Sequence, residues 1–345
     1  MREKVVLGLS GGVDSAVAAG LLSKEYEVYC VYLDIGLGGT GRADARAVAE
    51  GLGLPFEAVD IRAALEAEVC APFAADYLAG RTPLPCARCN PMVKFPALFT
   101  TADRIGARFV ATGHYARRLT GEDGRTLLLK GMPANDQSYM LSRLPREMLP
   151  RILFPLGDYE KNQVRAMAGE AALPVADKPD SMEICFIPDG DYAAWLDARG
   201  ATPPPGDFVD RAGNVLGRHR GIHHYTLGQG RGLGVSGPHR YFVSAIEPEG
   251  NRVVLSDGSD LHAAAAYCVD PNWIAVDGLE KPMEVTVRLR HSRTEAPAVI
   301  RGMSGGIWIE MHTPARAPTP GQLAVFYQGD VVVGSGWLAA PERRA

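Results

Sequence analysis

The feature that most constrains the fold is the stretch LGLSGGVDSAVAAGLL, which begins at Leu7. An apolar strand over residues 4–9 runs straight into Ser-Gly-Gly, and a helix from about Asp14 to Lys24 follows. Gly11 and Gly12 let backbone N–H groups converge without side-chain interference. The positive N-terminal end of the helix is aimed at the same point. These features predict a strand–loop–helix unit that binds phosphate, with a plain glycine-rich turn as the alternative.

Further strands alternate with helices in the first half of the chain. Strands are expected at residues 27–33, 56–61 and 107–114, and a helix at residues 41–53. Strands separated by helices predict a parallel sheet with helices on both faces. Ligands of such sheets bind beyond the carboxyl ends of the strands. The Ser-Gly-Gly loop follows the first strand and Thr112-Gly113-His114 follows the fourth, so we expect both at the same edge.

The pattern changes near residue 201. Residues 161–201 are expected to be helical, interrupted by SMEICFIPDGD, and the proline-rich ATPPPGDF then indicates a domain boundary. Short strands and many glycines follow. The predicted fold class is α/β: an N-terminal parallel sheet with helices on both faces, followed by two small mainly-β domains. The expected domains are residues 1–201, a central β domain at 205–272 and a C-terminal β-barrel-like domain at 273–345.

Charge limits where a nucleic acid could bind. The net charge of the 345 residues is −4, so any such surface must be a local patch. Residues 211–241 contain no acidic residue, and a solvated barrel face is the alternative to a phosphate-binding surface there. The candidate phosphate contacts are Arg211, Arg218, Arg220, Arg231 and Arg240, and a second group of Arg288, Arg290 and Arg293.

The sequence also bears on the location of the protein. No apolar run is long enough to cross a bilayer. The first residues, MREKVVLGLSGG, are broken too early by glycine for a signal peptide. We therefore expect a cytoplasmic protein without a membrane partner.

Six cysteines divide into two groups of three. In a large cytosolic protein a disulfide framework is not expected, and Cys30, Cys70 and Cys268 lie in apolar or helical contexts typical of buried residues. The other three need a separate explanation: Cys86 and Cys89 in GRTPLPCARCNPMVKF, and Cys185 in DKPDSMEICFIPDGDY.

The Cys-x-x-Cys segment suggests a reactive thiol. A helix is expected to begin near Cys89, and a cysteine at a helix N-terminus has a lowered pKa. Arg88 and Lys94 would add to this effect. Cys185 is far from Cys89 along the chain, so only the fold can bring the two together.

The motifs together resemble a known family. The loop lacks the Gly-Lys-Ser/Thr ending of a Walker motif, and its Ser-Gly-Gly-x-Asp-Ser pattern resembles the PP-loop ATP pyrophosphatases, which have an adenine nucleotide α-hydrolase-like fold and leave AMP on a substrate oxygen. Over nearly its whole length the chain resembles the tRNA-specific 2-thiouridylases, which place sulfur on the wobble uridine (position 34) of tRNA. The ordered motifs are GLSGGVDS, GRTPLPCARCN, ATGHYAR, NDQSYML, DSMEICFI, HHYTLGQGRGLGV and PGQLAVFYQGD.

The resemblance implies roles for individual residues. Cys89 would be the nucleophile, and Cys185 would carry sulfur as a persulfide that a sulfur-relay protein delivers. ATP would be bound by Gly8, Leu9, Ser10, Gly11, Gly12, Val13, Asp14, Ser15, Leu33 and Gly113. The tRNA and its target base would be contacted by Leu84, Pro85, Cys86, His114, Asn135, Asp136, Gln137, Arg288, Leu289 and Gln322.

The residue types suit the implied reaction. ATP adenylates O2 of the uridine, and Asp14 could hold the Mg²⁺ ion or cap the helix. Cys89 or the persulfide on Cys185 then attacks C2, and AMP departs. Thiol–disulfide exchange would release the sulfur from Cys185, with Cys89 as the resolving thiol. A transient Cys89–Cys185 disulfide is therefore predicted.

The chain departs from the family at a few positions. Cys86 stands where many members have an aspartate with an assigned acid/base role. A thiol acid/base is one interpretation, and an iron–sulfur cluster on Cys86, Cys89 and Cys185 with one open iron position is the other. A zinc site is less well supported, because three thiolates leave the fourth position unfilled. Asn135 replaces a usual lysine, and the segment after Leu33 is short.

Two other classes of function could also carry such a loop. A PP-loop ligase or amidotransferase for a small molecule would have a glutaminase segment, and none is obvious here. A non-catalytic tRNA- or metal-binding protein would not need the intact Ser-Gly-Gly-Val-Asp-Ser. Release of AMP and pyrophosphate from ATP in the presence of tRNA would separate such a binding protein from an enzyme.

Overall fold

The computed structural model describes residues 2–180, 184–200, 202–292 and 294–340. The N-terminal region contains a five-stranded parallel sheet in the order β3-β2-β1-β4-β7. Its strands are β1 (Lys4–Gly8), β2 (Glu27–Asp34), β3 (Phe56–Asp60), β4 (Phe109–Thr112) and β7 (Ile152–Leu153). The four strands expected in this region are confirmed, with small differences at their ends.

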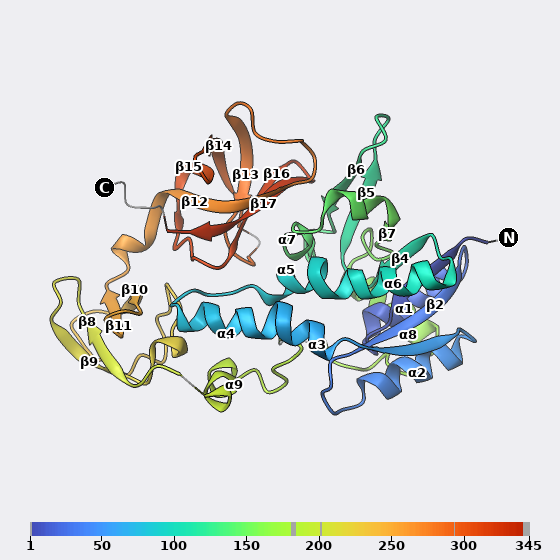
Figure 1. The fold of residues 1–345 in the computed structure, drawn as a ribbon, viewed down its shortest axis with the longest axis horizontal. Coiled ribbons are helices and arrows are strands. Elements are labelled where there is room, and N and C mark those ends of the chain that lie inside the picture. Colours follow the sequence, from blue (N-terminus) through green and yellow to red (C-terminus); the bar gives the residue numbers. More distant parts are fainter. Residues whose placement is uncertain (1, 181–183, 201, 293, 341–345) are drawn as a thin grey trace.

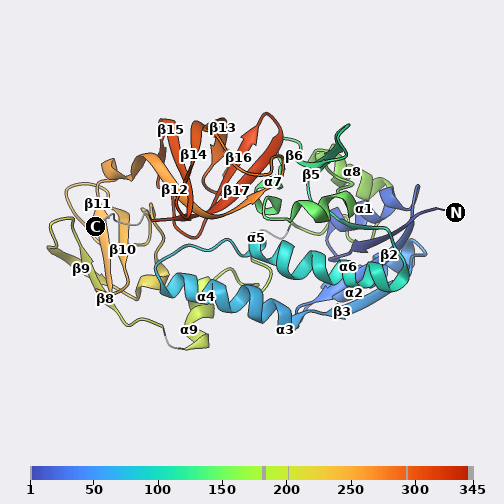
Figure 2. The same ribbon diagram turned by 45° about the horizontal axis from the view of Figure 1, so that its top comes forward.

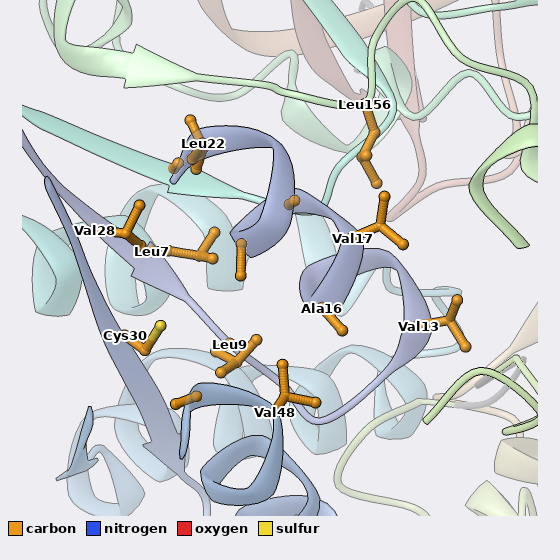
Figure 3. Packing of buried hydrophobic residues seen from close by; sticks show 14 of the residues in the cluster. Leu7, Leu9, Val13, Ala16, Val17, Leu22, Val28, Cys30, Val48 and Leu156 are labelled. Atoms are coloured by element: carbon orange, nitrogen blue, oxygen red, sulfur yellow. The ribbon is translucent and has the colours of Figure 1, made fainter. Parts of the chain in front are cut away.

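Helices cover both faces of this sheet, as expected. On one face lie α1 (Val13–Leu22), α2 (Gly41–Gly51) and α8 (Lys161–Glu170), and on the other lie α5 (Pro85–Cys89) and α6 (Phe95–Ile105). Side chains of β1 alternate between the faces, with Val5 and Leu7 in one buried cluster and Val6 in the other. Figure 3 shows the first cluster, in which α1 packs its small residues against β1 and β2.

A helical layer extends from this sheet. It comprises α3 (Arg62–Leu65), a π-helical segment at Glu66–Cys70, α4 (Ala71–Leu78) and α9 (Tyr192–Arg199), and α9 lies beside α4 in both views (Figures 1 and 2). Phe73 of α4 packs edge-on against Phe186 and against Trp195 of α9. A second π-helical segment, Asn90–Lys94, joins α5 to α6, and α7 spans Ser138–Leu141.

Two β regions follow. The smaller one is a four-stranded sheet in the order β10-β11-β8-β9, formed by β8 (Gly206–Val209), β9 (Val215–His219), β10 (Phe242–Glu247) and β11 (Arg252–Ser256). In the larger sheet β12 pairs with both β15 and β17, so its six C-terminal strands close into a barrel. They are β12 (His262–Trp273), β13 (Met283–Arg288), β14 (Ala296–Met303), β15 (Gly306–Arg316), β16 (Leu323–Gln328) and β17 (Val331–Ala339).

The strand pairing differs from the expected domain limits. β12 belongs to the barrel, although residues 262–272 were assigned to the central domain. The hairpin of β5 (Ala116–Thr120) and β6 (Thr126–Lys130) also joins the barrel sheet, through a pairing of β6 with β17. We propose that the central domain ends between β11 and β12. No helix in the described ranges is long and apolar enough to span a membrane.

Candidate functional site

The register of the sheet brings two predicted segments together. Gly8 at the end of β1 is paired with Thr112 at the end of β4. The Ser-Gly-Gly loop and Gly113-His114 therefore leave the sheet at the same edge, as expected. A Cβ atom on Gly113 would lie 2.9 Å from the backbone nitrogen of Ser15, so only glycine allows β4 to approach the first turn of α1 this closely.

Hydrogen bonds hold the loop in shape. The Ser10 backbone N–H donates to Ser15 Oγ at 3.1 Å, and Ser15 Oγ donates to the Gly12 carbonyl at 3.0 Å. Gly12 is the N-cap residue of α1 and contributes no side chain, so Asp14 is not the cap that was considered. The N–H groups of the first helical turn are thus left for a ligand, which suits an anion such as phosphate.

Gly11 is the most constrained position of the loop. Its φ is +76°, and a Cβ atom there would lie 2.3 Å from the Gly41 carbonyl oxygen of α2. We expect Gly11→Ala to lower ATP affinity and to destabilise the fold by about 1–2 kcal/mol, because the left-handed conformation disfavours a side chain. Thermal unfolding and ATP titration measure both effects.

Gly20→Ala is the matched control, because Gly20 lies inside α1 with nothing within 4 Å of an added Cβ. It should raise the stability by up to about 1 kcal/mol and leave ATP binding unchanged. Equal behaviour of the two variants would contradict the assigned role of Gly11.

Asp14 lies in a network of charges. Its Oδ1 accepts hydrogen bonds from Tyr115 Oη at 2.7 Å and from Lys161 Nζ at 2.6 Å. Lys161 also contacts Asp180 at 2.8 Å, and Arg165 contacts Asp180 at 2.7 Å. Desolvation tends to raise the pKa of Asp180, but these two cations lower it overall. The carboxylate of Asp14 is therefore poised either to orient Lys161 or to bind a cation beside the loop.

A second lysine lies against the loop from another segment. Lys178 Nζ donates to the Gly11 carbonyl at 2.9 Å and to Asp44 Oδ2 at 2.6 Å. Sequence reasoning missed both Lys161 and Lys178, because an isolated lysine carries no motif. The only available signal for Lys178 was its position in DKPDS, next to the cysteine segment. Together the two lysines could neutralise phosphate charge at this edge of the sheet.

The helix around Cys89 differs from the prediction. α5 begins at Pro85, so Cys89 is its last residue and the chain continues helically through Asn90–Lys94 into α6. The predicted activation by a helix N-terminus is therefore wrong. Burial raises the pKa of the Cys89 thiol, and the cation of Lys94 partly opposes this. Arg88, which was expected to help, instead stacks on the Trp337 ring at 5.3 Å.

The structure brings Cys185 into the neighbourhood of Cys89 and Cys86. Cys89 and Ile184 pack against the same buried cluster. Desolvation of the Cys185 thiol by the surrounding protein atoms raises its pKa to about 12. The nearby Cys89 and Cys86 thiols act in the same direction. Cys185 and Cys86 are nevertheless exposed to solvent. Residues 181–183 of the same predicted segment lie outside the described ranges.

Lys94 gives a way to test the environment of Cys89. Removing the cation should raise the pKa of Cys89 further, so less thiolate exists at a given pH. We expect Lys94→Met to slow the alkylation of Cys89 near neutral pH and to shift the pH profile of the rate upward. Peptide mass spectrometry isolates Cys89 from the other thiols. Arg88→Met is the control and should leave the profile in place.

His114 connects the thiols with the loop. Its Nε2 lies 3.5 Å from Lys94 Nζ and its Nδ1 lies 2.7 Å from Thr112 Oγ1. Desolvation and the Lys94 cation hold the pKa of His114 well below its usual value, so the ring is neutral. The chain of contacts runs from Cys89 through Lys94 and His114 to the end of β4.

Some predicted tRNA contacts instead have local structural partners. Gln322 Nε2 donates to the Thr82 carbonyl at 3.0 Å, which holds the segment leading to Leu84 and Pro85. Gln137 Oε1 accepts from the Tyr115 backbone N–H at 2.9 Å. Asn135 Nδ2 donates to Glu160 Oε2 at 3.3 Å. Of the three, Gln322 holds the approach to α5, whereas the side chains of Gln137 and Asn135 are engaged elsewhere.

Arg288 and Asp136 need a correction. Arg288 Nη1 contacts Asp136 Oδ2 at 2.8 Å and Nη2 contacts Glu295 Oε1 at 2.9 Å, and the side chains of Arg288 and Asp136 are 8% and 4% exposed. Leu289 is also buried. None of these three side chains is available to a tRNA in this structure. The ion pair joins the region before α7 to strand β13 of the barrel.

The role of Arg288 can be measured as stability. Arg288→Met leaves the buried carboxylate of Asp136 without its cation, whereas Glu295 keeps Lys130, so the free energy of unfolding should fall by about 3 kcal/mol. Denaturant unfolding gives this value. The control is Arg301→Met, whose exposed pair with Glu310 spans 3.6 Å. It should change stability by less than about 1 kcal/mol.

The basic residues of the β regions are also partly engaged. Arg211 pairs with Asp260 at 3.7 Å and Arg218 with Asp207 at 3.3 Å. Arg290 donates to the carbonyls of Ala317 and Leu227, so it is a structural residue. Arg293 lies outside the described ranges. The two described members of the second arginine group, Arg288 and Arg290, are therefore not open phosphate-binding residues.

Three protein families together match nearly the whole chain. The families described as tRNA methyl transferase HUP domain, tRNA methyl transferase PRC-barrel domain and Aminomethyltransferase beta-barrel domain match residues 3–189, 195–257 and 264–338. The chain is 44% identical over 354 residues to the tRNA-specific 2-thiouridylase MnmA of Lachnoclostridium phytofermentans, covering 97% of this chain and 99% of that protein.

Two further relatives carry the same name. The protein of Heliobacterium modesticaldum is 44% identical over 357 residues, covering 98% of this chain and 93% of its own length. That of Paramagnetospirillum magneticum is 42% identical over 363 residues, covering 99% and 96%. The alignments with these relatives extend through the sheet, the helical layer and both β regions. The chain therefore belongs to the family of tRNA-specific 2-thiouridylases.

Proposed function

We propose that this protein uses ATP to place sulfur on C2 of the wobble uridine (position 34) of tRNA. The observation that carries the proposal is the chain of contacts from the thiols to the loop. Lys94 beside Cys89 contacts His114, and His114 follows Gly113, which packs on the first turn of α1. A nucleotide held at the loop and a base held at α5 would therefore be neighbours.

The first half of the proposed reaction is adenylation. The loop N–H groups, Ser10 and Ser15, with Lys161 and Lys178, would hold the phosphates of ATP. Asp14 would hold Mg²⁺, which would supply positive charge for the phosphates. Uridine O2 attacks the α-phosphorus, pyrophosphate leaves, and the O2–AMP bond turns that oxygen into a leaving group.

The second half transfers sulfur. The terminal sulfur of a Cys185 persulfide attacks C2, and AMP departs with the former O2. The Cys89 thiolate then attacks the Cys185 sulfur, which breaks the S–S bond to the base and leaves a Cys89–Cys185 disulfide. An external thiol reduces this disulfide for the next cycle. Burial raises the pKa of Cys89, and the cation of Lys94 partly opposes this, so Lys94 favours the attacking thiolate.

The exposure of Cys185 supports a protein as sulfur donor. Its side chain is exposed at the surface, whereas Cys30, Cys70 and Cys268 are buried, as expected. A carrier protein that holds a cysteine persulfide could reach Cys185 before the tRNA binds and pass its outer sulfur to the Cys185 thiolate, leaving the carrier with a free thiol. The neighbouring acidic residue Asp189 is exposed as well, so a carrier surface with positive charge would be favoured there.

An iron–sulfur cluster on Cys86, Cys89 and Cys185 is the second candidate. The Cys89 and Cys86 thiols lie close enough to Cys185 to raise its pKa. This proximity supports the cluster, because a cluster needs three convergent thiolates. When bound, the cluster would supply an open iron position that holds the sulfide to be transferred. Single-ion ligation is less well supported, since the group of three candidate ligands found within 4.8 Å of one another in the described ranges contains no cysteine.

Chelator-treated protein distinguishes these candidates. It is incubated with ATP, Mg²⁺, a persulfide donor and unmodified tRNA, and the tRNA is digested for mass spectrometry. Formation of 2-thiouridine with release of AMP and pyrophosphate supports the persulfide reaction. Activity that returns only with iron and sulfide under anaerobic conditions supports the cluster. No 2-thiouridine under either condition would refute the proposed function.

The variant Cys86→Asp also distinguishes the persulfide reaction from the cluster reaction, because aspartate is the residue that many family members have at this position. Under the persulfide mechanism the variant should thiolate tRNA without iron. Under the cluster mechanism it should lose both iron and activity.

A further inference from the structure

A cluster of nitrogen and oxygen ligands lies away from the thiols and the nucleotide loop. His223 and His224 end the short 3-10 turn Ile222–His224, and they face Asp197 in α9. Within the described ranges these three form the one group of at least three His, Cys, Asp or Glu residues whose ligand atoms all lie within 4.8 Å of one another. The proposed reaction uses none of them.

The spacing of the three side chains suits a single ion. His223 Nε2 lies 2.9 Å from Asp197 Oδ1, and His224 Nε2 lies 3.6 Å from Asp197 Oδ2. In a tetrahedral zinc site the bonds of about 2.0–2.2 Å place neighbouring ligand atoms about 3.3–3.6 Å apart. The first observed separation is shorter than this range, the second lies at its upper end, and the ligand atoms of all three residues lie within 4.8 Å of one another.

The burial of the site is uneven. The side chains of His223 and His224 are 1% and 11% exposed, whereas that of Asp197 is 47% exposed. Gly221 makes room for the first ring, because a Cβ atom there would lie 2.5 Å from His223 Cε1. Two preorganised imidazoles with an open carboxylate side leave an entry path for an ion and a position for one water molecule.

The ring of His223 has one unused nitrogen. The buried Nδ1 of His223 has no hydrogen-bond partner among the described residues. The Nε2 of the same ring shares a hydrogen bond with Asp197 Oδ1 at 2.9 Å, and a metal ion would take the place of the shared proton.

A third histidine nearby shows the contrasting structural case. His219 Nδ1 accepts from the Gly221 N–H at 3.1 Å, and its Nε2 lies 3.1 Å from the Asn251 carbonyl. Both of its nitrogens are used by the backbone, which leaves none for an ion.

We propose that Asp197, His223 and His224 bind a divalent transition metal ion, with Zn²⁺ as the preferred ion and water as its fourth ligand. α9 packs on α4 through Trp195, and the turn Ile222–His224 belongs to the central β region. The ion would thus join the helical layer to the central β domain. This site is independent of the proposed sulfur transfer.

The test uses the full-length protein with Cys86, Cys89 and Cys185 all replaced by serine, so that the thiols cannot bind the probe. After chelation the protein is titrated with Co²⁺. We expect one ion per chain, with the visible absorption of a four-coordinate site and without a thiolate charge-transfer band. Asp197→Asn and His224→Gln should each weaken binding at least about tenfold. Zn²⁺ should displace Co²⁺ and raise the midpoint of thermal unfolding of the parent protein but not of Asp197→Asn.

His312→Gln is the matched control. His312 is half exposed on the barrel and lies 3.5 Å from Glu284, outside any group of three ligands in the described ranges. The His312→Gln variant should bind Co²⁺ with the same affinity as the parent protein. The proposal is overturned if the parent shows no saturable binding, or if neither Asp197→Asn nor His224→Gln weakens binding. Equal weakening by His312→Gln would also overturn it.

Discussion

Cys89→Ala and Cys185→Ala are each expected to reduce the formation of 2-thiouridine by at least about 10³-fold, because removal of a nucleophile leaves only binding and positioning. Adenylation precedes both sulfur steps, so pyrophosphate release in a single turnover should persist in both variants. The measurements are mass spectrometry of digested tRNA and quantification of pyrophosphate.

The two cysteine variants should also differ from each other. Without Cys185 no sulfur is loaded, whereas without Cys89 the sulfur reaches Cys185 and stays there. Labelled sulfur should therefore remain bound to the Cys89→Ala protein. The control is Cys268→Ala, whose thiol is buried in the barrel, and it should keep its activity. Near-normal thiolation in either main variant would rule out the two-cysteine mechanism.

Asp14→Ala should lower the rate of AMP and pyrophosphate formation by about 10²–10³-fold, the cost of removing one group that stabilises transition-state charge. Loss of the Asp14 carboxylate should slow the reaction whether this group orients Lys161 or binds Mg²⁺, because either cation would act on the phosphates. Asp14→Asn should lose as much, because the amide keeps the shape but not the charge. Initial rates of pyrophosphate release with saturating tRNA measure the effect.

Tyr115→Phe is the control for Asp14. It removes the hydrogen bond of 2.7 Å to Asp14 Oδ1 but leaves the ion pair with Lys161. We expect Tyr115→Phe to lower the rate of pyrophosphate release less than Asp14→Asn does. If Asp14→Ala turned over like the parent protein, Asp14 would have no place in the reaction.

The correction at Arg288 shows where a family motif misleads. A position that matches a tRNA contact suggested an open cation, but the side chain is enclosed by Asp136, Glu295 and the Tyr327 ring at 5.0 Å. A sequence shows that a charge is present and not whether another charge already neutralises it. The same reasoning applies to Arg290, which is bound to backbone carbonyls.

The expected activation of Cys89 failed for a related reason. A helix was expected to begin near Cys89, but it begins at Pro85, which occupies the first helical position. A shift of one helical turn moved Cys89 from the start of the helix to a buried position within a longer helical run. Its pKa then depends on burial and on Lys94, which local sequence rules do not describe.

The sequence by itself determined the features that repeat or interact locally. Alternating apolar strands and helices predicted the parallel sheet, and the glycines of Ser-Gly-Gly predicted the phosphate loop, because backbone sterics and helix dipoles act over a few residues. The motifs identified the family for the same reason. Only the tertiary structure decided which distant groups meet: Lys161 and Lys178 at the loop, Cys185 near Cys89, β12 in the barrel, and Asp197 opposite His223. Such contacts depend on long-range packing and on competition between charges, and neither is encoded in the order of neighbouring residues.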